Sequence, residues 1–404
     1  MSTAALYHIH GIRGYKHRAI KWKKGGMEWH IEQPRERCVC PKCGNKNVIL
    51  KGRKERRFLS VPSGSKRVTI VLGVPRVYCP ECDLTRQVAV PFARPMTRHT
   101  RCFERHVLGM LEFATTLDVA NHLGVSWGLI RSIEESMLRK KFGKPRLKDV
   151  RVIAIDEIAV KKGHRYMTIV TDLDSGQVIH VGDGAGVKSL DPFWRRLRAS
   201  RAKIQAVATD MSPAYIAAVE KNLPQATQVF DRFHVVKLFN KHMDDLRKRI
   251  QRKLSETSDK QALKRLRWIL LKRRENLDPL KGEPDRLEAA LQANHDLYVA
   301  YLLKEELCEF WNQEDYDTAE GMLVDWLAYA EASGIPELIS FCKTVRNHAL
   351  GMLAYHDFNI TTGPLEGLNN KIKTLKRQAY GFRNDDYFKL KLYAIHKTRY
   401  ALVG

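Results

Sequence analysis

Three acidic residues stand where a protein could hold divalent metal ions. Asp156 follows the apolar run RVIAI and Asp210 follows IQAVAT, so each carboxylate is expected at the end of a buried strand. Glu366 lies in GPLEGLNNKIK, where Gly363-Pro364 opens an expected helix and places the glutamate in its first turn. Carboxylates are the hard ligands that Mg2+ or Mn2+ prefers, and a pair of such ions stabilises both the attacking and the leaving oxygen of an in-line displacement at phosphorus.

Each of these acids also has a simpler explanation. An aspartate at a strand end is often a cap or loop residue, and Glu366 alone is explained by the positive end of the helix dipole. The helix dipole does not explain Asn370, Lys373 and Arg377, which lie four, seven and eleven positions after Glu366 and so share its helix face. A carboxylate above a strip of donors suits the binding of a DNA strand, so we expect these three residues to contact DNA.

Four cysteines form two CxxC pairs, Cys40-Pro-Lys-Cys43 and Cys79-Pro-Glu-Cys82. Two such turns make a tetrahedral sulfur cage for Zn2+, and their position among short expected strands predicts a zinc ribbon over residues 38–92. The metal would be structural, since a domain this small depends on it to fold. Free thiols and a redox pair are the alternatives. Cys38 could replace Cys40, but the spacing favours Cys40.

The segment TLDVANHLGVSWGLIRSIEESM (116–137) has the pattern of a helix-turn-helix. Gly124 supplies the turn, Ser126 caps the second helix, and Ile130 and Ile133 face inward. A plain helical hairpin is the alternative reading. The residues then expected to face a DNA groove are Trp127, Arg131 and Ser132.

The charge balance points to a polyanionic partner. The 404 residues include 70 Lys and Arg against 45 Asp and Glu, a formal net charge of +25, and residues 1–110 alone hold 23 against 7. Neutralising phosphates releases condensed counterions, so nucleic acid is the expected ligand. No apolar run is long enough for a membrane span, and the first thirty residues have no secretory apolar region.

The elements that must position the acids follow a change of pattern near residue 146. Strands are expected at 151–156, 166–173, 177–184, 204–210 and 226–231, with a nearly all-helical stretch afterwards and a last basic helix at 364–378. The fold class is therefore multidomain α/β. We expect a basic region with the zinc ribbon at 1–95, a helix-turn-helix domain at 96–145, and a catalytic domain at 146–404 with a helical insertion at about 238–357.

Several stretches together resemble bacterial insertion-sequence transposases of the ISL3 group, which carry a DDE triad. They are IAIDEIAVKKGHRYMTIVTDL, AVATDMSPAY, FDRFHVVK and GPLEGLNNKIKTLKRQAYGFRNDDYFKLKLY. The resemblance implies a ribonuclease-H-like core in which the first and fourth strands are neighbours, with Asp156, Asp210 and Glu366 in the triad roles. Asp231 and His234 look typical of the group, and two roles stay open for Asp231: support of the metal site, or a structural turn with His234.

The resemblance also implies partners and a reaction. It implies double-stranded DNA, with the transposon's inverted-repeat ends and a target DNA as substrates, cleavage and strand transfer by 3′-hydroxyl attack, and a homodimer or larger active complex. A bacterial cytoplasmic, nucleoid-associated protein with no membrane partner is expected. A non-catalytic DNA-binding regulator, or a nuclease or resolvase on the same fold, are the alternative functions.

Overall fold

The computed structural model describes residues 3–161, 165–230, 232–254, 257–358, 360 and 363–397. The chain divides into two compact units. The first contains the residues up to Lys141 together with Lys376–Arg383, and the second contains Phe142–Leu375 and Asn384–Lys397. None of the helices in the described parts is both long and apolar enough to cross a membrane.

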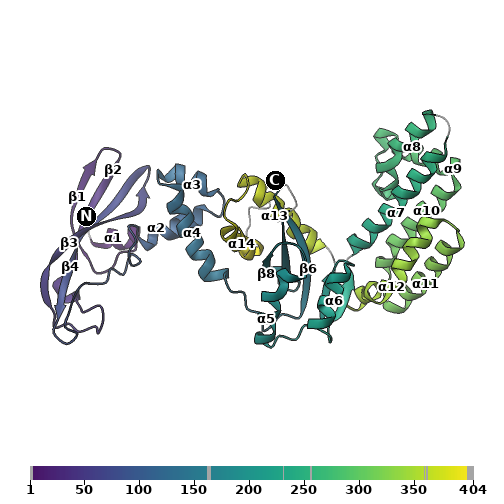
Figure 1. The fold of residues 1–404 in the computed structure, drawn as a ribbon. Helices are drawn as coiled ribbons and strands as arrows, with labels where there is room; N and C mark the ends of the chain where they lie inside the picture. The colour runs from purple at the N-terminus through teal and green to yellow at the C-terminus, as the bar shows by residue number, and fades with distance from the viewer. Residues whose placement is uncertain are drawn as a thin grey trace. The chain divides into compact units, whose positions relative to one another are not determined.

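The first unit begins with helix α1 (Thr3–His10) and a five-stranded sheet, which Figure 1 shows in purple and blue. Strand order is β1-β2-β4-β3, and β5 pairs with the end of β4. Buried Phe58, Ile70 and Leu72 form its core. The bounds are β1 Lys16–Lys23, β2 Gly26–Glu32, β3 Ile49–Ser63, β4 Lys66–Cys79 and β5 Leu84–Gln87.

The expectation of short strands in this region was wrong for β3 and β4, which have 15 and 14 residues. Their antiparallel pairing continues through the basic run at 51–57, most of whose side chains are exposed. Main-chain hydrogen bonds hold a hairpin without apolar side chains, so the hydrophobic pattern marks only the part of each strand that covers the core.

Three helices complete the first unit, α2 (Arg101–Met110), α3 (Thr116–Leu123) and α4 (Trp127–Phe142). The helix-turn-helix pattern predicted α3 and α4, and the apolar side chains of all three helices share one small core. Its buried members from the three helices are Phe103, Val107, Val119, Ala120, Ile130 and Ile133.

The second unit contains a five-stranded sheet in the order β10-β9-β6-β7-β8. Strands β6, β7 and β8 are antiparallel neighbours, whereas β9 lies parallel to both β6 and β10. The expectation that the first and fourth strands of this region are neighbours is confirmed, because they are β6 and β9. The bounds are β6 Val152–Lys161, β7 Arg165–Asp172, β8 Gln177–Asp183, β9 Ala206–Thr209 and β10 Thr227–Phe230.

Helices cover both faces of this sheet. Helices α5 (Asp191–Ser200) and α6 (Pro213–Asn222) pack on one face, where Ile153 and Val207 meet Phe193. The opposite face has alanines at the corresponding strands, and there Ala208 lies in one apolar cluster with Leu365 of the later helix α13 (Gly363–Gln378). Small side chains let a helix approach a sheet closely, so the alternation of large and small residues along β6 and β9 decides which helix lies on which face.

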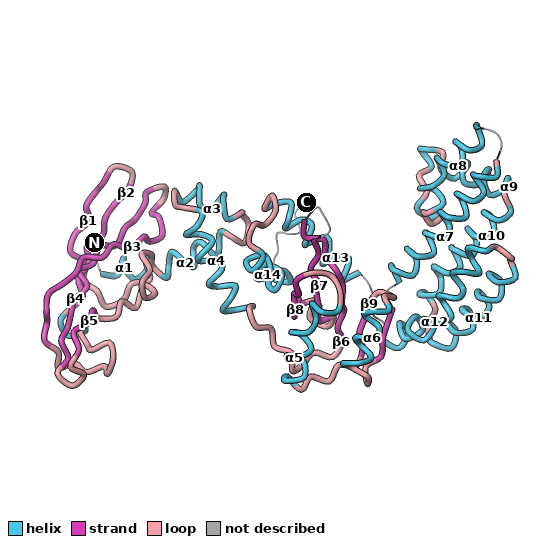
Figure 2. Tube along the Cα trace, in the orientation of Figure 1, coloured by secondary structure: helices cyan, strands magenta, loops and turns pink. Residues whose placement is uncertain are grey.

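Over its described residues the stretch after β10 is helical, as the sequence predicted, and Figure 2 shows these residues as helices and loops. Its last helix returns to the sheet: a side-chain carbon added at Gly351 would lie 2.4 Å from the ring of Phe230 on β10. The helices are α7 Arg232–Lys253, α8 Thr257–Leu270, α9 Glu283–Ala293, α10 His295–Glu309, α11 Tyr316–Ala332 and α12 Pro336–Phe358.

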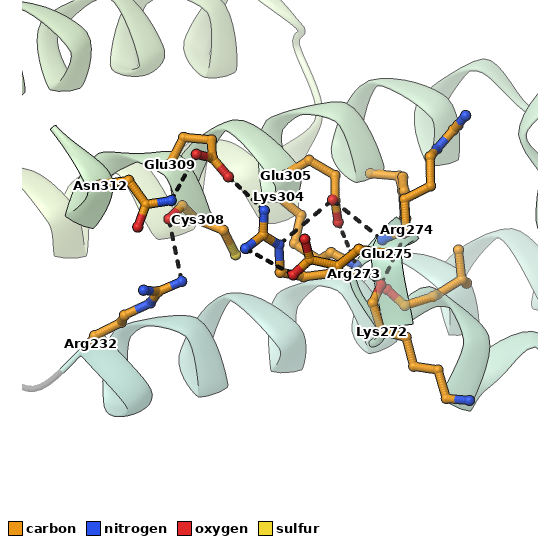
Figure 3. A network of polar contacts seen from close by, with 12 residues as sticks. Arg232, Lys272, Arg273, Arg274, Glu275, Lys304, Glu305, Cys308, Glu309 and Asn312 are labelled. Atoms are coloured by element: carbon orange, nitrogen blue, oxygen red, sulfur yellow. Dashed lines mark hydrogen bonds and ion pairs between the residues drawn. The ribbon is translucent and has the colours of Figure 1, made fainter. Parts of the chain in front are cut away.

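A polar network lies inside this helical insertion (Figure 3). The Lys304 side chain is almost completely buried, and its Nζ donates to the carbonyl oxygens of Leu270 and Lys272, at 2.8 and 2.5 Å. Those oxygens stand at and just past the end of α8, where a helix leaves carbonyls without helical partners. Arg273 donates to Glu309 close by. The network joins the end of α8 to α10.

The prediction that α13 is the last helix was wrong, because one more helix follows it. Helix α14 (Asp385–Ala394) begins after Asn384, whose side chain accepts from the backbone N–H of Tyr387 at 2.7 Å. It packs beside β8, where the Tyr393 hydroxyl accepts from the backbone N–H of Val181 at 3.2 Å.

Candidate functional site

The four predicted zinc ligands come together. One sulfur each from Cys40, Cys43, Cys79 and Cys82 forms a group whose members all lie within 4.8 Å of one another. The Sγ atoms of Cys43 and Cys79 are 3.6 Å apart and those of Cys40 and Cys82 are 4.0 Å apart. Sulfurs about 2.3 Å from a tetrahedral zinc are separated by about 3.8 Å, so the arrangement fits the metal. Cys38 stands outside the group, with its thiol directed to the carbonyl oxygen of Pro34.

Local backbone geometry prepares this centre for a cation. The backbone N–H groups of Cys43 and Lys42 lower the pKa of the Cys40 thiol to about 6. Hydrogen bonding from Cys43 is the main cause that raises the pKa of Cys82 to about 12. Four thiols this close cannot all ionise without a positive charge between them, and zinc supplies that charge. Gly44 takes the left-handed conformation expected after the first pair, with φ +78°. The residues therefore fit a structural Zn2+.

Helices α3 and α4 meet at the predicted tight turn. Gly124 ends α3 in the left-handed conformation, with φ +60°, and the backbone N–H of Leu129 donates to the Ser126 hydroxyl at 3.3 Å. Ile130 and Ile133 are buried, as predicted. The three residues expected to face DNA differ in exposure: Trp127 and Ser132 are exposed, whereas Arg131 is half-buried with its guanidinium 5.4 Å from the centre of the Trp127 ring.

Asp156 lies on β6, and Asp210 follows the end of the neighbouring strand β9. The last parallel pair between β6 and β9 is Ala154 with Ala208, and each aspartate stands two residues after its member of that pair. The prediction that Asp156 ends its strand was wrong, because β6 continues to Lys161 in antiparallel pairing with β7. β9, in contrast, stops at Thr209, so among the described residues β6 has no parallel partner strand beyond this point. Asp210 then turns the chain toward α6, and its Oδ1 accepts from the backbone N–H of Ser212 at 3.1 Å.

Glu366 lies in the first turn of α13, as predicted, with an exposed side chain. Asn370, Lys373 and Arg377 are exposed on the same face, whereas Leu368 and Ile372 are buried on the other. The three carboxylates do not form a closed metal cluster: over the parts of the chain that the structure describes, the cysteine centre is the one group of His, Cys, Asp or Glu placed to hold an ion.

Sequence reasoning missed the residue that connects α13 to the aspartates. Asn369 Nδ2 donates to Oδ2 of Asp156 at 2.8 Å. The other oxygen of Asp156, Oδ1, accepts from the backbone N–H of Glu157 at 2.7 Å. The neighbouring Asn370 drew attention because it continues the face of Glu366, and nothing in the helical period alone distinguishes the two asparagines.

A second polar group lies on the opposite face of the sheet from Asp156. The Tyr215 hydroxyl of α6 donates to the Glu157 carboxylate at 2.5 Å, and the backbone N–H of Gly186 donates to the same oxygen at 3.0 Å. Burial is the main cause that raises the pKa of Tyr215 to about 12. These contacts anchor β6 next to Asp156. Two further residues were expected to be typical of the family. His234 is half-buried on the first turn of α7, and Asp231 lies outside the described residues.

Comparison with known proteins identifies the class. A transposase family model matches residues 153–392, and a model for the zinc-finger of transposase IS204/IS1001/IS1096/IS1165 matches residues 36–82. The transposase for insertion sequence element IS1001 of Bordetella parapertussis is 30% identical over 391 residues, which cover 95% of this chain and 96% of that protein. The chain therefore belongs to the ISL3 group of transposases, enzymes that cut and join DNA.

Two further similarities were found. The transposase for insertion sequence element IS1557 of Mycobacterium tuberculosis is 29% identical over 370 residues, which cover 85% of this chain and 82% of that protein. Among solved structures, the Drosophila P element transposase strand transfer complex covers 67% of this chain and 82% of its own, with 13% identity and a TM-score of 0.36.

Proposed function

We propose that this transposase binds the terminal inverted repeats of an insertion sequence and catalyses Mg2+-dependent cleavage and strand transfer, with Asp156, Asp210 and Glu366 as its catalytic residues. Mn2+ would serve in place of Mg2+. The observation that carries the proposal is the register of β6 and β9, which aligns the two aspartates at the point where β9 ends. The contact from Asn369 to Asp156 holds the helix of Glu366 at this same point.

The topology supports a ribonuclease-H-like core. Three antiparallel strands are followed by two parallel ones on the far side of the first, and Asp156 lies on the first strand while Asp210 directly follows the fourth. Bound Mg2+ ions would supply Lewis-acid stabilisation of the attacking and leaving oxygens. Each Asp156 oxygen accepts one hydrogen bond, which fixes the carboxylate and leaves further lone pairs for a metal. The exposed Glu366 side chain is free to turn toward an ion beside them.

Two surfaces would hold the DNA. We propose that α3 and α4 form a helix-turn-helix whose second helix enters the major groove with Trp127, Arg131 and Ser132. The exposed strip on α13 would contact the strand being cut. Its members are Asn370, Lys373 and Arg377.

These roles give the chain three functional parts. They are a basic region with the zinc ribbon at 1–95, a DNA-binding domain at 96–145 and a catalytic domain at 146–404. The zinc ribbon would hold its part of the DNA-binding region in shape. We further propose that the active species is a homodimer or larger complex which joins both transposon ends to a target DNA, in the bacterial cytoplasm at the nucleoid.

The test is a cleavage and joining assay on a duplex that carries the element's terminal inverted repeat. The variants are Asp156→Asn, Asp210→Asn and Glu366→Gln, which keep side-chain shape and remove one metal-binding charge each. Asp174→Asn is the matched control, because Asp174 is an exposed acid in the turn between β7 and β8. DNA binding is measured in parallel by fluorescence anisotropy.

We expect each of the three variants to bind DNA as the wild type does and to lose at least 100-fold in cleavage rate, while the control stays active. A wild type that binds but never cuts, with Mg2+ or with Mn2+, would favour the regulator over the enzyme. Full activity of Glu366→Gln alone would assign the third metal ligand elsewhere, with Asp231 as the next candidate. Cleavage without joining would favour a nuclease or resolvase.

A further inference from the structure

The contact between Asn369 and Asp156 joins two parts of the catalytic domain that are more than 200 residues apart in sequence. We infer that Asn369 is a positioning residue for the proposed metal site: its side-chain amide orients the Asp156 carboxylate and fixes helix α13, and with it Glu366, against strand β6. The inference rests on the proposed function, because it assigns Asn369 a role toward the metal that the three acids would hold.

The two oxygens of Asp156 accept hydrogen bonds from two different parts of the chain. Oδ1 accepts from the backbone N–H of Glu157, the next residue on the same strand, at 2.7 Å. Oδ2 accepts from the Asn369 amide, which belongs to a helix on the sheet face that Asp156 shares with Ala154. A carboxylate with one donor on each oxygen cannot rotate without losing one of them. The remaining lone pairs therefore keep a constant direction, which is what a metal site requires of its ligands.

Asn369 also fixes the position of Glu366 along the helix. The two residues are three positions apart, about 4.5 Å along the axis at 1.5 Å per residue, on adjacent turns of one side. Apolar contacts place the same helix: Leu365 lies in one cluster with Ala154 of β6 and Ala208 of β9, each two residues before an aspartate. Leucine against alanine gives no defined register, because apolar contact has no direction. The directional hydrogen bond supplies that register.

The choice between the two adjacent asparagines follows from exposure. Asn370 is exposed on the face expected to contact DNA, whereas Asn369 is half-buried and has Asp156 as its partner. A matched comparison exists elsewhere in the same unit. Asn222, on α6, is also half-buried on a helix, and its Nδ2 donates at 2.8 Å to the Ala218 carbonyl, away from the acids.

The test detects metal binding without DNA and without catalysis. Zinc-loaded protein is titrated with Fe2+ in ascorbate and peroxide, so that an iron ion held by the acids cuts the nearby backbone by hydroxyl radicals, and the fragments are mapped by mass spectrometry. The variants are Asn369→Leu, which keeps the branching and the number of heavy atoms but removes the amide, Asn369→Ala, and the control Asn222→Ala. Thermal unfolding of each zinc-loaded variant, without added Fe2+, establishes that it is folded.

We expect wild type and Asn222→Ala to be cut near residues 156, 210 and 366. Both Asn369 variants should require at least 10-fold more Fe2+ for the same cutting, the lower end of the loss found when a partner of a metal ligand is removed. In the cleavage assay, the Mg2+ concentration for half-maximal rate should rise by the same factor.

Three results would overturn the inference. Wild-type protein that is not cut near the acids would refute the proposed metal site together with the role of Asn369. Cutting of folded Asn369→Leu at the wild-type Fe2+ concentration would refute the role of Asn369 alone. An equal weakening in Asn222→Ala would show that any lost helix hydrogen bond has this effect, which also refutes a specific role.

Discussion

Replacing Lys304 by methionine should remove a pH dependence from the stability of the helical insertion. Burial lowers the pKa of Lys304 from 10.5 to about 8. The unfolded chain therefore binds this proton more tightly than the folded chain, and between pH 8 and 10.5 it holds more protons. The free energy of unfolding contributed by Lys304 is then fully present above pH 10.5 and is lost as the pH falls to 8. At 1.36 kcal/mol for each pH unit, the loss is about 3 kcal/mol.

The measurement is urea unfolding of wild type and Lys304→Met at intervals from pH 7 to 10.5, followed by tryptophan fluorescence. Trp326 is a suitable reporter, because its indole N–H donates to the carbonyl oxygen of Leu303 at 2.7 Å, next to the lysine. The free energy of unfolding of the variant should differ from that of the wild type at every pH, since the carbonyls of Leu270 and Lys272 lose their donor. The difference between the two proteins should also change by about 3 kcal/mol across this range. A difference that stays constant with pH would refute the reasoning, because it would mean that the lysine keeps an ordinary pKa in the fold.

Three further predictions concern other parts of the chain. Cys79→Ser should lose the bound zinc, measured by elemental analysis of the purified protein, whereas Cys38→Ser should keep it; zinc loss from both would contradict the assignment of the four ligands. Gly351→Ala should destabilise the second unit by about 1–3 kcal/mol, because the added carbon would meet the ring that α12 packs against, and an unchanged thermal unfolding midpoint would count against this packing. Tyr215→Phe should cost about 1–3 kcal/mol in urea unfolding, because Glu157 loses a hydroxyl donor and keeps one backbone N–H; the double variant with Glu157→Gln should then cost little more than the single one.

The five strands of the second unit were predictable from apolar runs bounded by charge. That the first and fourth of them are neighbours was expected from the resemblance to insertion-sequence transposases, and not from the runs themselves. The extent of β6 was not predictable from the same signal. A charged residue after an apolar run indicates a strand end, yet β6 continues past Asp156 because β7 pairs with it as far as Lys161. Tertiary pairing decided the end of the strand.

The N-terminal sheet and α14 show two other limits. The expected strands of the zinc region were too short because β3 continues through a basic run that carries no apolar pattern. Helix α14 did have a local signal: Asn384 precedes two acidic residues and an apolar series that includes Tyr387 and Phe388, which together are typical of a helix start.

For the candidate site, residue type and spacing identified the zinc ligands fully, since two CxxC turns leave few alternatives for the geometry of a sulfur cage. Among the acids they identified the strand neighbours, but not the contact that joins the third element to them. Helical spacing distinguishes residues on one face of a helix from residues on the other. Asn369 and Asn370 are adjacent and only about 100° apart around the helix axis, so spacing alone does not decide which of them meets β6. Which of them meets β6 depends on how α13 rotates on the alanine surface, and that rotation follows from the burial of Leu365, Leu368 and Ile372.

The helical insertion packs against the part of the sheet that carries the acids, and it also directly precedes α13 in the sequence. Its last helix, α12, places Ala354 in the apolar cluster that also contains Ala154, Ala208 and Leu365. Only residues 359–362 separate α12 from α13. Gly351 leaves no room beside Phe230 for this packing to adjust, so we expect a shift of α12 on β10 to displace Ala354 and, through the shared apolar cluster, Leu365 at the start of α13. We therefore expect Gly351→Ala to reduce the cleavage rate of protein that is still folded at the assay temperature. A folded Gly351→Ala protein that cuts at the wild-type rate would show that α13 takes its position from the Asn369 contact without help from the insertion.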